Sequence, residues 1–393
     1  MASFMNYIKY KYKNRIMKSH VLKTIALVIL FMGLVSFTSL DNDKDPASKK
    51  GTIKVALLLD TSNSMDGLIN QAKAQLWEIV NELSYAKYGK TKPKLEIALY
   101  EYGNSSLSSK EGYIRQVLQF SNDLDEISEK LFSLKTNGGS EFCGQVIQTS
   151  LNELNWGTNK NDLRLLFIAG NEPFTQGKID YRDAITNAAE KNVIVNTIFC
   201  GNYDQGISGM WQDGAHKGGG DYMTINHNKT IVHIVTPYDA QIIILNKQLN
   251  KTYIYYGNQG ASKYKAQAVQ DVNAQELDEV VIVKRAVSKS SRLYSNSSWD
   301  LVDADKNGRV DYKKLDKKSL PKNLQNKSAS EIKKYVENQR LQRKEIQQKI
   351  QDLDKKRRIF IAKKQQESTK KNELESVMIK AIKRQAQLKN YNW

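Results

Sequence analysis

The chain has 393 residues, of which 40% are hydrophobic, and its formal net charge is +18. This length is sufficient for one large α/β domain with additional segments. The charge is uneven, because residues 1–40 contribute +6 and residues 317–393 contribute +14, which leaves −2 for residues 41–316. A nucleic-acid-binding domain normally carries its basic residues on its folded face. The near-neutral centre therefore argues against nucleic acid as a partner.

The N-terminal 40 residues have the character of an export signal. They contain six basic residues and no acidic residue, and residues 25–37 form an uninterrupted apolar run of 13 residues. This run is shorter than the roughly 20 residues that span a bilayer, and it matches the apolar part of a signal peptide. No clear cleavage site follows, so a cleaved signal peptide and an uncleaved N-terminal anchor both remain open. Both predict an exported protein of the periplasm or cell envelope, with a linker over residues 41–50.

Residues 51–235 alternate between strand-like and helix-like patterns. This alternation predicts βαβ units and a sheet covered by helices on both faces. Lys94–Tyr102 and Gly112–Phe120 are joined by a short polar segment, so one of them is expected to be an antiparallel edge strand. The expected strands are Ile53–Asp60, Lys94–Tyr102, Gly112–Phe120, Leu163–Gly170, Val193–Cys200 and Tyr222–Asn226. The expected helices are Leu68–Tyr85, Asp125–Ser133, Gly144–Leu154 and Tyr181–Lys191.

The first expected strand runs into a loop of oxygen-bearing side chains. Residues 53–59 are almost entirely apolar, and Asp60, Ser62 and Ser64 follow at alternate positions. Ligands of open α/β sheets bind at the carboxyl edge of the strands. Carboxylate and hydroxyl oxygens are the ligands that hard divalent cations prefer. The spacing therefore predicts a metal ion at this edge of the sheet.

The Asp-x-Ser-x-Ser loop resembles the metal-ion-dependent adhesion site (MIDAS) of von Willebrand factor A (vWA) domains. The sequences GGSE at residues 138–141 and LRLLFIAGNE at residues 163–172 resemble the second and third metal loops of that family. The resemblance implies a Rossmann-like vWA fold that binds Mg²⁺ or Mn²⁺. It also implies a coordination position left open for an acidic residue of a protein partner. The implied ligands in the first two loops are Asp60, Ser62, Ser64 and Ser140.

The third loop departs from the family pattern. The usual motif ends its strand in Thr-Asp-Gly, and alignment by the strand places Gly170 at the aspartate. Asn171 or Glu172 would restore an oxygen by a small shift of the loop, so both are included among the expected metal ligands. The alternative is a degenerate loop that is held by hydrogen bonds without an ion.

Two further motifs carry weaker expectations. Cys143 and Cys200 are both expected at the carboxyl rim, where an exported protein permits a disulfide, but two separate buried thiols are equally compatible with the sequence. Residues 303–314 imitate an EF-hand loop, although Lys314 replaces the bidentate glutamate at the last position. We therefore expect a turn rich in Asp and Asn there, and no Ca²⁺ site.

The C-terminal part is expected to be mainly helical. We expect an accessory region at residues 236–316, packed on a vWA domain at residues 51–235, and a basic helical tail at residues 317–393. This arrangement resembles a group of exported bacterial vWA proteins. Residues 330–389 contain no Gly or Pro, and an apolar stripe along them is interrupted at Gln339 and Arg343. The tail is expected to dock through this stripe, to contribute little to folding of the vWA domain, and to give possible attachment to anionic membrane surfaces.

These observations predict an exported, metal-dependent protein-binding module. No nucleophile and base with a known catalytic spacing occur in the chain, so we do not expect an enzyme. The alternative function is an envelope scaffold protein, in which the metal loop is degenerate and the helical tail mediates the interaction.

Overall fold

The computed structural model describes residues 51–225, 233–367 and 373–393. The predicted export segment lies outside the described residues. The central element is a six-stranded sheet in the order β4-β3-β1-β5-β6-β7. All neighbouring strands are parallel except β4, which runs antiparallel to β3 at one edge. The strands are β1 (Thr52–Asp60), β3 (Lys94–Tyr102), β4 (Ile114–Ser121), β5 (Leu163–Gly170), β6 (Val193–Phe199) and β7 (Gly219–Thr224).

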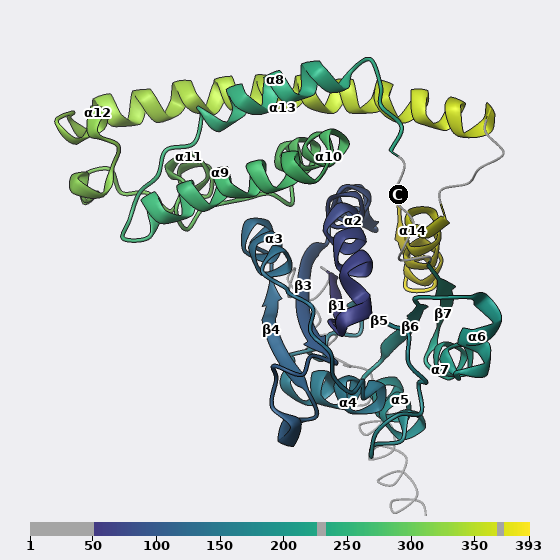
Figure 1. Cartoon of the computed structure of the whole chain (residues 1–393). Helices are drawn as coiled ribbons and strands as arrows, with labels where there is room; N and C mark the ends of the chain where they lie inside the picture. Colours follow the sequence, from purple (N-terminus) through teal and green to yellow (C-terminus); the bar gives the residue numbers. More distant parts are fainter. Residues whose placement is uncertain (1–50, 226–232, 368–372) are drawn as a thin grey trace, which may run out of the picture. The chain divides into compact units, whose positions relative to one another are not determined.

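Helices cover both faces of this sheet, as the alternating sequence pattern predicts (Figure 1). The helices α2 (Asp66–Ser84) and α3 (Leu124–Phe132) pack on one face. The helices α4 (Cys143–Glu153), α5 (Tyr181–Glu190) and α7 (Trp211–Lys217) pack on the other. Successive side chains of a strand point to opposite faces, so the central strands supply both cores. In β1, Val55 belongs to the first core and Leu58 to the second. The mostly parallel α/β fold expected from the sequence is confirmed.

Short elements connect these layers. The helix α6 lies between β6 and α7, and a small antiparallel pair joins β2 to β8 near the end of the chain. These elements are η1 (Asn63–Met65), β2 (Lys87–Tyr88), η2 (Ser109–Glu111), α6 (Tyr203–Ser208) and β8 (Tyr391–Asn392).

A helical region follows the sheet and lies against α2 and α3. Its elements are α8 (Asp239–Asn250), α9 (Gly260–Leu277), α10 (Glu279–Ser290), α11 (Leu301–Lys306), η3 (Lys317–Ser319), α12 (Lys322–Gln325), α13 (Ala329–Glu367) and α14 (Glu373–Gln387). The amide of Asn81 in α2 donates to the carbonyl oxygen of Lys284 in α10 over 2.9 Å. Within the described parts of the chain, no helix has the length and apolar character needed to cross a membrane.

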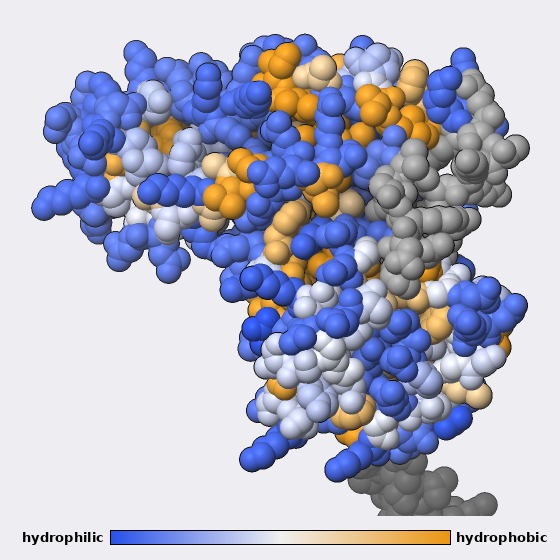
Figure 2. Space-filling model, viewed as in Figure 1, coloured by the Kyte–Doolittle hydropathy of each residue, from blue (hydrophilic) through white to orange (hydrophobic). Residues whose placement is uncertain are grey.

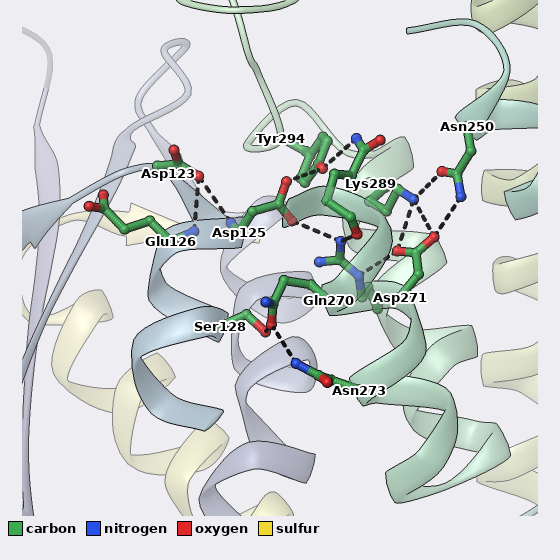
Figure 3. Close-up of polar contacts among 12 residues, drawn as sticks. Asp123, Asp125, Glu126, Ser128, Asn250, Gln270, Asp271, Asn273, Lys289 and Tyr294 are labelled. Carbon is green, nitrogen blue, oxygen red and sulfur yellow. Dashed lines mark hydrogen bonds and ion pairs between the residues drawn. The ribbon is translucent and has the colours of Figure 1, made fainter. Parts of the chain in front are cut away.

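A buried ionic network joins α3 to the helical region. Figure 3 shows Asp125 of α3 beside Tyr294, and Asp271 of α9 beside Lys289 of α10. Arg285 of α10 connects the two acids, because its guanidinium lies 2.8 Å from Asp125 and 2.6 Å from Asp271. The two neighbouring cations hold the pKa of Asp271 well below its usual range, although burial opposes this. The buried acids of this region are thus neutralised by buried cations.

The C-terminal tail contributes buried residues to the core, and the expectation that it is separable stays a prediction. Arg343 of α13 is buried, and its guanidinium lies 2.6 Å from Asp300 and stacks over Tyr253. Arg357 is buried against Asp239 in the same way. At the end of the chain, Tyr391 is 2% exposed and belongs to the core on the α2 side of the sheet. The apolar stripe and these buried arginines therefore form one continuous contact surface with the rest of the protein.

Candidate metal site

The first loop of the predicted site is fixed at the carboxyl end of β1. The backbone N–H of Thr61 donates to the carbonyl oxygen of Tyr102 over 2.9 Å, which ties the loop to the end of β3. Asp60 is fully buried, and its Oδ1 accepts a 2.7 Å hydrogen bond from the backbone N–H of Ser62. This short-range bond is an Asx-type turn, and it aims the carboxylate back over the loop. The other oxygen, Oδ2, is buried without a hydrogen-bond partner.

A second carboxylate lies next to Asp60. Glu141, in the loop before α4, is 3% exposed. A Cβ atom built on Gly103 would be 2.8 Å from both Asp60 Oδ1 and Glu141 Cγ, so both side chains lie directly against this glycine. Burial, together with the adjacent Glu141 carboxyl, raises the pKa of Asp60 well above its usual range. Burial also raises the pKa of Glu141, although contacts with Asp60 and Ser62 oppose this rise.

The loops contain buried oxygen atoms that lack partners. In the described part of the chain, Asp60 Oδ2, Ser62 Oγ, Glu141 Oε2 and Asn171 Oδ1 are buried and have no hydrogen-bond partner outside this cluster of side chains. Buried polar atoms are almost always paired in proteins, so a group of unpaired oxygens requires an explanation. Two carboxylates, a hydroxyl and an amide oxygen form a donor set that suits a hard divalent cation. The residues present therefore fit the ion that the resemblance implies.

The remaining predicted ligands lie at the rim of the loops. Ser64 is exposed, and its Oγ accepts a 3.2 Å hydrogen bond from Asn171 Nδ2, which joins the first loop to the third. Ser140 and the side chain of Glu172 are exposed. The Glu172 carbonyl oxygen accepts a 2.8 Å hydrogen bond from the indole N–H of Trp211. The structure thus brings Asp60 and Ser62 together with Glu141, and places Ser140 and Glu172 toward solvent.

Gly170 has no room for a side chain. A Cβ atom at this position would be 2.5 Å from the Tyr102 hydroxyl, 3.2 Å from Trp211 Cη2 and 3.3 Å from Asp60 Oδ2. Tyr102 and Trp211 are both fully buried, and the Tyr102 hydroxyl donates to the carbonyl oxygen of Ala169. An aspartate at position 170, where alignment by the strand placed the acid of the family pattern, would therefore have no space.

The GGSE segment was expected to supply Ser140, which is exposed, and its role as a ligand stays a prediction. The sequence analysis did not single out Glu141, which is the buried side chain of this segment. The signal that could have identified Glu141 is an acid placed between a glycine pair and the apolar start of a helix. Within the described residues, no group of three or more His, Cys, Asp or Glu side chains could hold a metal ion. A metal at these loops would therefore depend on hydroxyl and amide oxygens in addition to the two carboxylates.

The two cysteines and the EF-hand-like segment take no part in this site. Cys143 and Cys200 are free, buried thiols, and they belong to the cores on opposite faces of the sheet. This placement explains why they do not form a disulfide. Asp303, the first position of the EF-hand-like segment, is in helix α11 and forms an ion pair with Arg343. The segment therefore begins as a helix instead of a calcium loop.

Comparison with known proteins agrees with this architecture. Residues 54–207 match the family described as the von Willebrand factor type A domain. This segment is a vWA domain. A helical region follows it, and the loops described above lie at the carboxyl edge of the sheet of this domain. No curated protein matches the chain.

Several solved structures are similar to the vWA domain at low identity. The VWA domain of SpRpn10 is 15% identical, with 44% of this chain and 88% of that chain covered and a TM-score of 0.32. An aerotolerance-related membrane protein from Bacteroides fragilis, with multiple mutations to serines, is 15% identical, with coverages of 45% and 93% and a TM-score of 0.30. Proximal thread matrix protein 1 from the mussel byssus, with a zinc-occupied MIDAS motif, is 10% identical, with coverages of 46% and 43% and a TM-score of 0.32.

Proposed function

We propose that this chain is an exported binding protein whose vWA domain holds Mg²⁺ or Mn²⁺ and binds a protein partner through that ion. The observation that supports the proposal is the group of buried, unpaired oxygens at the carboxyl edge, which includes Asp60 Oδ2 and Ser62 Oγ. Ser64 and Asn171 extend the donor set to the rim. A bound divalent cation would supply a positive charge that attracts an acidic side chain of the partner. Export is supported by the apolar run at residues 25–37.

The chain's own residues give this site a defined opening. The Asp60 carboxylate accepts a hydrogen bond from the backbone N–H of Ser62 in its own loop. Ser64 and Ser140 are exposed on the solvent side of the loops. A partner would therefore approach from the rim, where these two hydroxyls and Glu172 lie. No nucleophile with an adjacent base accompanies the loops within the described residues, so we propose binding without catalysis.

Metal-dependent stabilisation tests the proposal. Thermal unfolding of the purified chain is measured with and without Mg²⁺ or Mn²⁺. An ion present at 100 times its Kd should stabilise the folded protein by about 2.7 kcal/mol through mass action. Asp60→Asn should lose this increment, and Asp183→Asn, which changes an exposed acid on α5, should keep it. The proposal is wrong if the metal increment is absent in the unmodified chain or is unchanged in Asp60→Asn.

The scaffold function is a second candidate, and exposed apolar side chains on the helical region favour it. Ile244 of α8 is 50% exposed and Ile359 of α13 is 72% exposed. Figure 2 shows apolar side chains among hydrophilic ones over these helices. Partner recovery from envelope extracts separates the two functions. Binding through the ion should be lost in EDTA and in Asp60→Asn, and binding through the helices should survive both but be lost in Ile359→Ser.

A further inference from the structure

The charges around Asp60 differ from those around other buried acids of this protein. Asp271, Asp300 and Asp239 each lie within ion-pair distance of a buried lysine or arginine. Asp60 and Glu141 form no ion pair with a basic residue anywhere in the described ranges. Two buried carboxyl groups without a cation repel each other and lose solvation. Within its described residues, the chain therefore places a cationic side chain beside these three other buried acids but none beside Asp60 and Glu141.

We propose that Glu141 is a direct ligand of the metal ion and the second carboxylate of the site. This inference rests on the proposed metal-binding function. Glu141 Oε2 and Asp60 Oδ2 are both buried and unpaired, and the two side chains meet over Gly103. A divalent ion between them would neutralise both charges and satisfy both oxygens. Nothing in the family resemblance assigned a role to Glu141.

The backbone of the second loop fixes Glu141 in this position. Its N–H donates a 2.9 Å hydrogen bond to Gln176 Oε1, and α4 begins two residues later at Cys143. A Cβ atom on Gly139 would be 2.5 Å from the carbonyl oxygen of Gly103, so the loop lies directly against the segment that follows β3. Close packing of the backbone in the second loop therefore directs the Glu141 side chain inward.

The third loop explains why this carboxylate is needed. The position at which the family carries its aspartate is Gly170, and the Tyr102 hydroxyl and Trp211 ring occupy the space that a side chain would need there. In this chain the second loop supplies a buried acid, Glu141, beside Asp60.

The test compares isosteric variants of two acids, one buried in the second metal loop and one exposed on α5. Mn²⁺ binding to the purified full chain is measured by the electron paramagnetic resonance of free Mn²⁺. Glu141→Gln should weaken Mn²⁺ binding by about 10- to 100-fold or more, because loss of a supporting partner alone has an effect of that size. Asp183→Asn removes the same charge from an exposed position on α5, outside the metal loops, and should change the Kd by less than about twofold. Equal affinity of Glu141→Gln and the unmodified chain would overturn the inference.

A second variant separates direct ligation from a general effect of charge. Glu141→Asp keeps the charge but withdraws the carboxylate by one methylene. A direct ligand predicts weaker binding in this variant too, whereas a long-range charge effect predicts unchanged binding and would overturn the inference. Circular dichroism of each variant without metal establishes that it is folded. If the unmodified chain binds no Mn²⁺, the proposed function fails as well, whereas binding that is insensitive to Glu141 leaves the proposed function intact and removes only this inference.

Discussion

Gly170→Ala should destabilise the protein by about 1–3 kcal/mol, which is the typical penalty for forcing an added carbon into a close-packed core. The new Cβ atom would lie 2.5 Å from the Tyr102 hydroxyl and 3.2 Å from Trp211 Cη2. Neither ring can move away easily, because both are fully buried. The Tyr102 hydroxyl is also held by its 2.9 Å hydrogen bond to the carbonyl oxygen of Ala169. The full steric penalty should therefore appear in the free energy of unfolding.

Urea unfolding, followed by circular dichroism, measures this penalty. Gly138→Ala is the matched control, because it makes the same change in the second metal loop. The nearest atom to its new Cβ would be Asn63 Nδ2 at 4.0 Å, which leaves the side chain unhindered. This control should change the free energy of unfolding by no more than about 0.5 kcal/mol. A penalty for Gly170→Ala that is no larger than that of the control would refute the steric argument.

A double-mutant cycle identifies the atom responsible. Tyr102→Phe removes the hydroxyl and should by itself cost about 0.5–1.5 kcal/mol through the lost hydrogen bond to Ala169. Gly170→Ala should then be less damaging in the Tyr102→Phe background, with a coupling energy of about 0.5–3 kcal/mol. If the penalty is the same in both backgrounds, the Tyr102 hydroxyl is not what excludes a side chain from the third loop.

Two further predictions concern the core. Arg343→Met should reduce the free energy of unfolding by about 3–5 kcal/mol, because it leaves the buried carboxylate of Asp300 without its cation; Arg340→Met, at an exposed pair, should cost at most about 1 kcal/mol in the same denaturation experiment. Burial raises the pKa of Cys143 and Cys200 well above the usual range of a thiol. Both should therefore stay protonated and unmodified by a thiol reagent at about pH 8.5, where half of free cysteine is thiolate, and both should react in denaturant. Rapid modification of the native protein would contradict this.

Most of the sheet could be predicted because its strands are short apolar runs with clear ends. The strand β5 was expected at Leu163–Gly170 and lies there, since burial on both faces makes every residue of the run except Arg164 apolar or small. The last strand was less accurate, because it was expected to begin at Tyr222 and β7 begins at Gly219. The reason is a close approach of two strands, in which a Cβ atom on Gly220 would contact the backbone of Val195. Such an approach depends on a neighbour that is distant in sequence.

The site and the tail were harder to predict for a similar reason. Glu141 is buried where Gly103, in the segment that follows β3, leaves space beside Asp60. Arg343 was interpreted as an interruption of an apolar stripe, yet it is buried because Asp300 and Thr252 supply its hydrogen bonds. A sequence pattern shows which side chains could be buried as apolar groups. It does not show which charged side chains find a partner from a distant segment.

The position of Tyr391 has a consequence for how the protein is made. Its hydroxyl donates hydrogen bonds to the carbonyl oxygens of Asn161 and Thr52, and the latter residue is 339 positions earlier in the chain. Contacts across so long a separation form late, because the loop between them must first be ordered. The contact of the first strand with Tyr391 therefore forms only after residue 391 has been synthesised. A nascent chain that stops short of this residue would leave that apolar surface exposed.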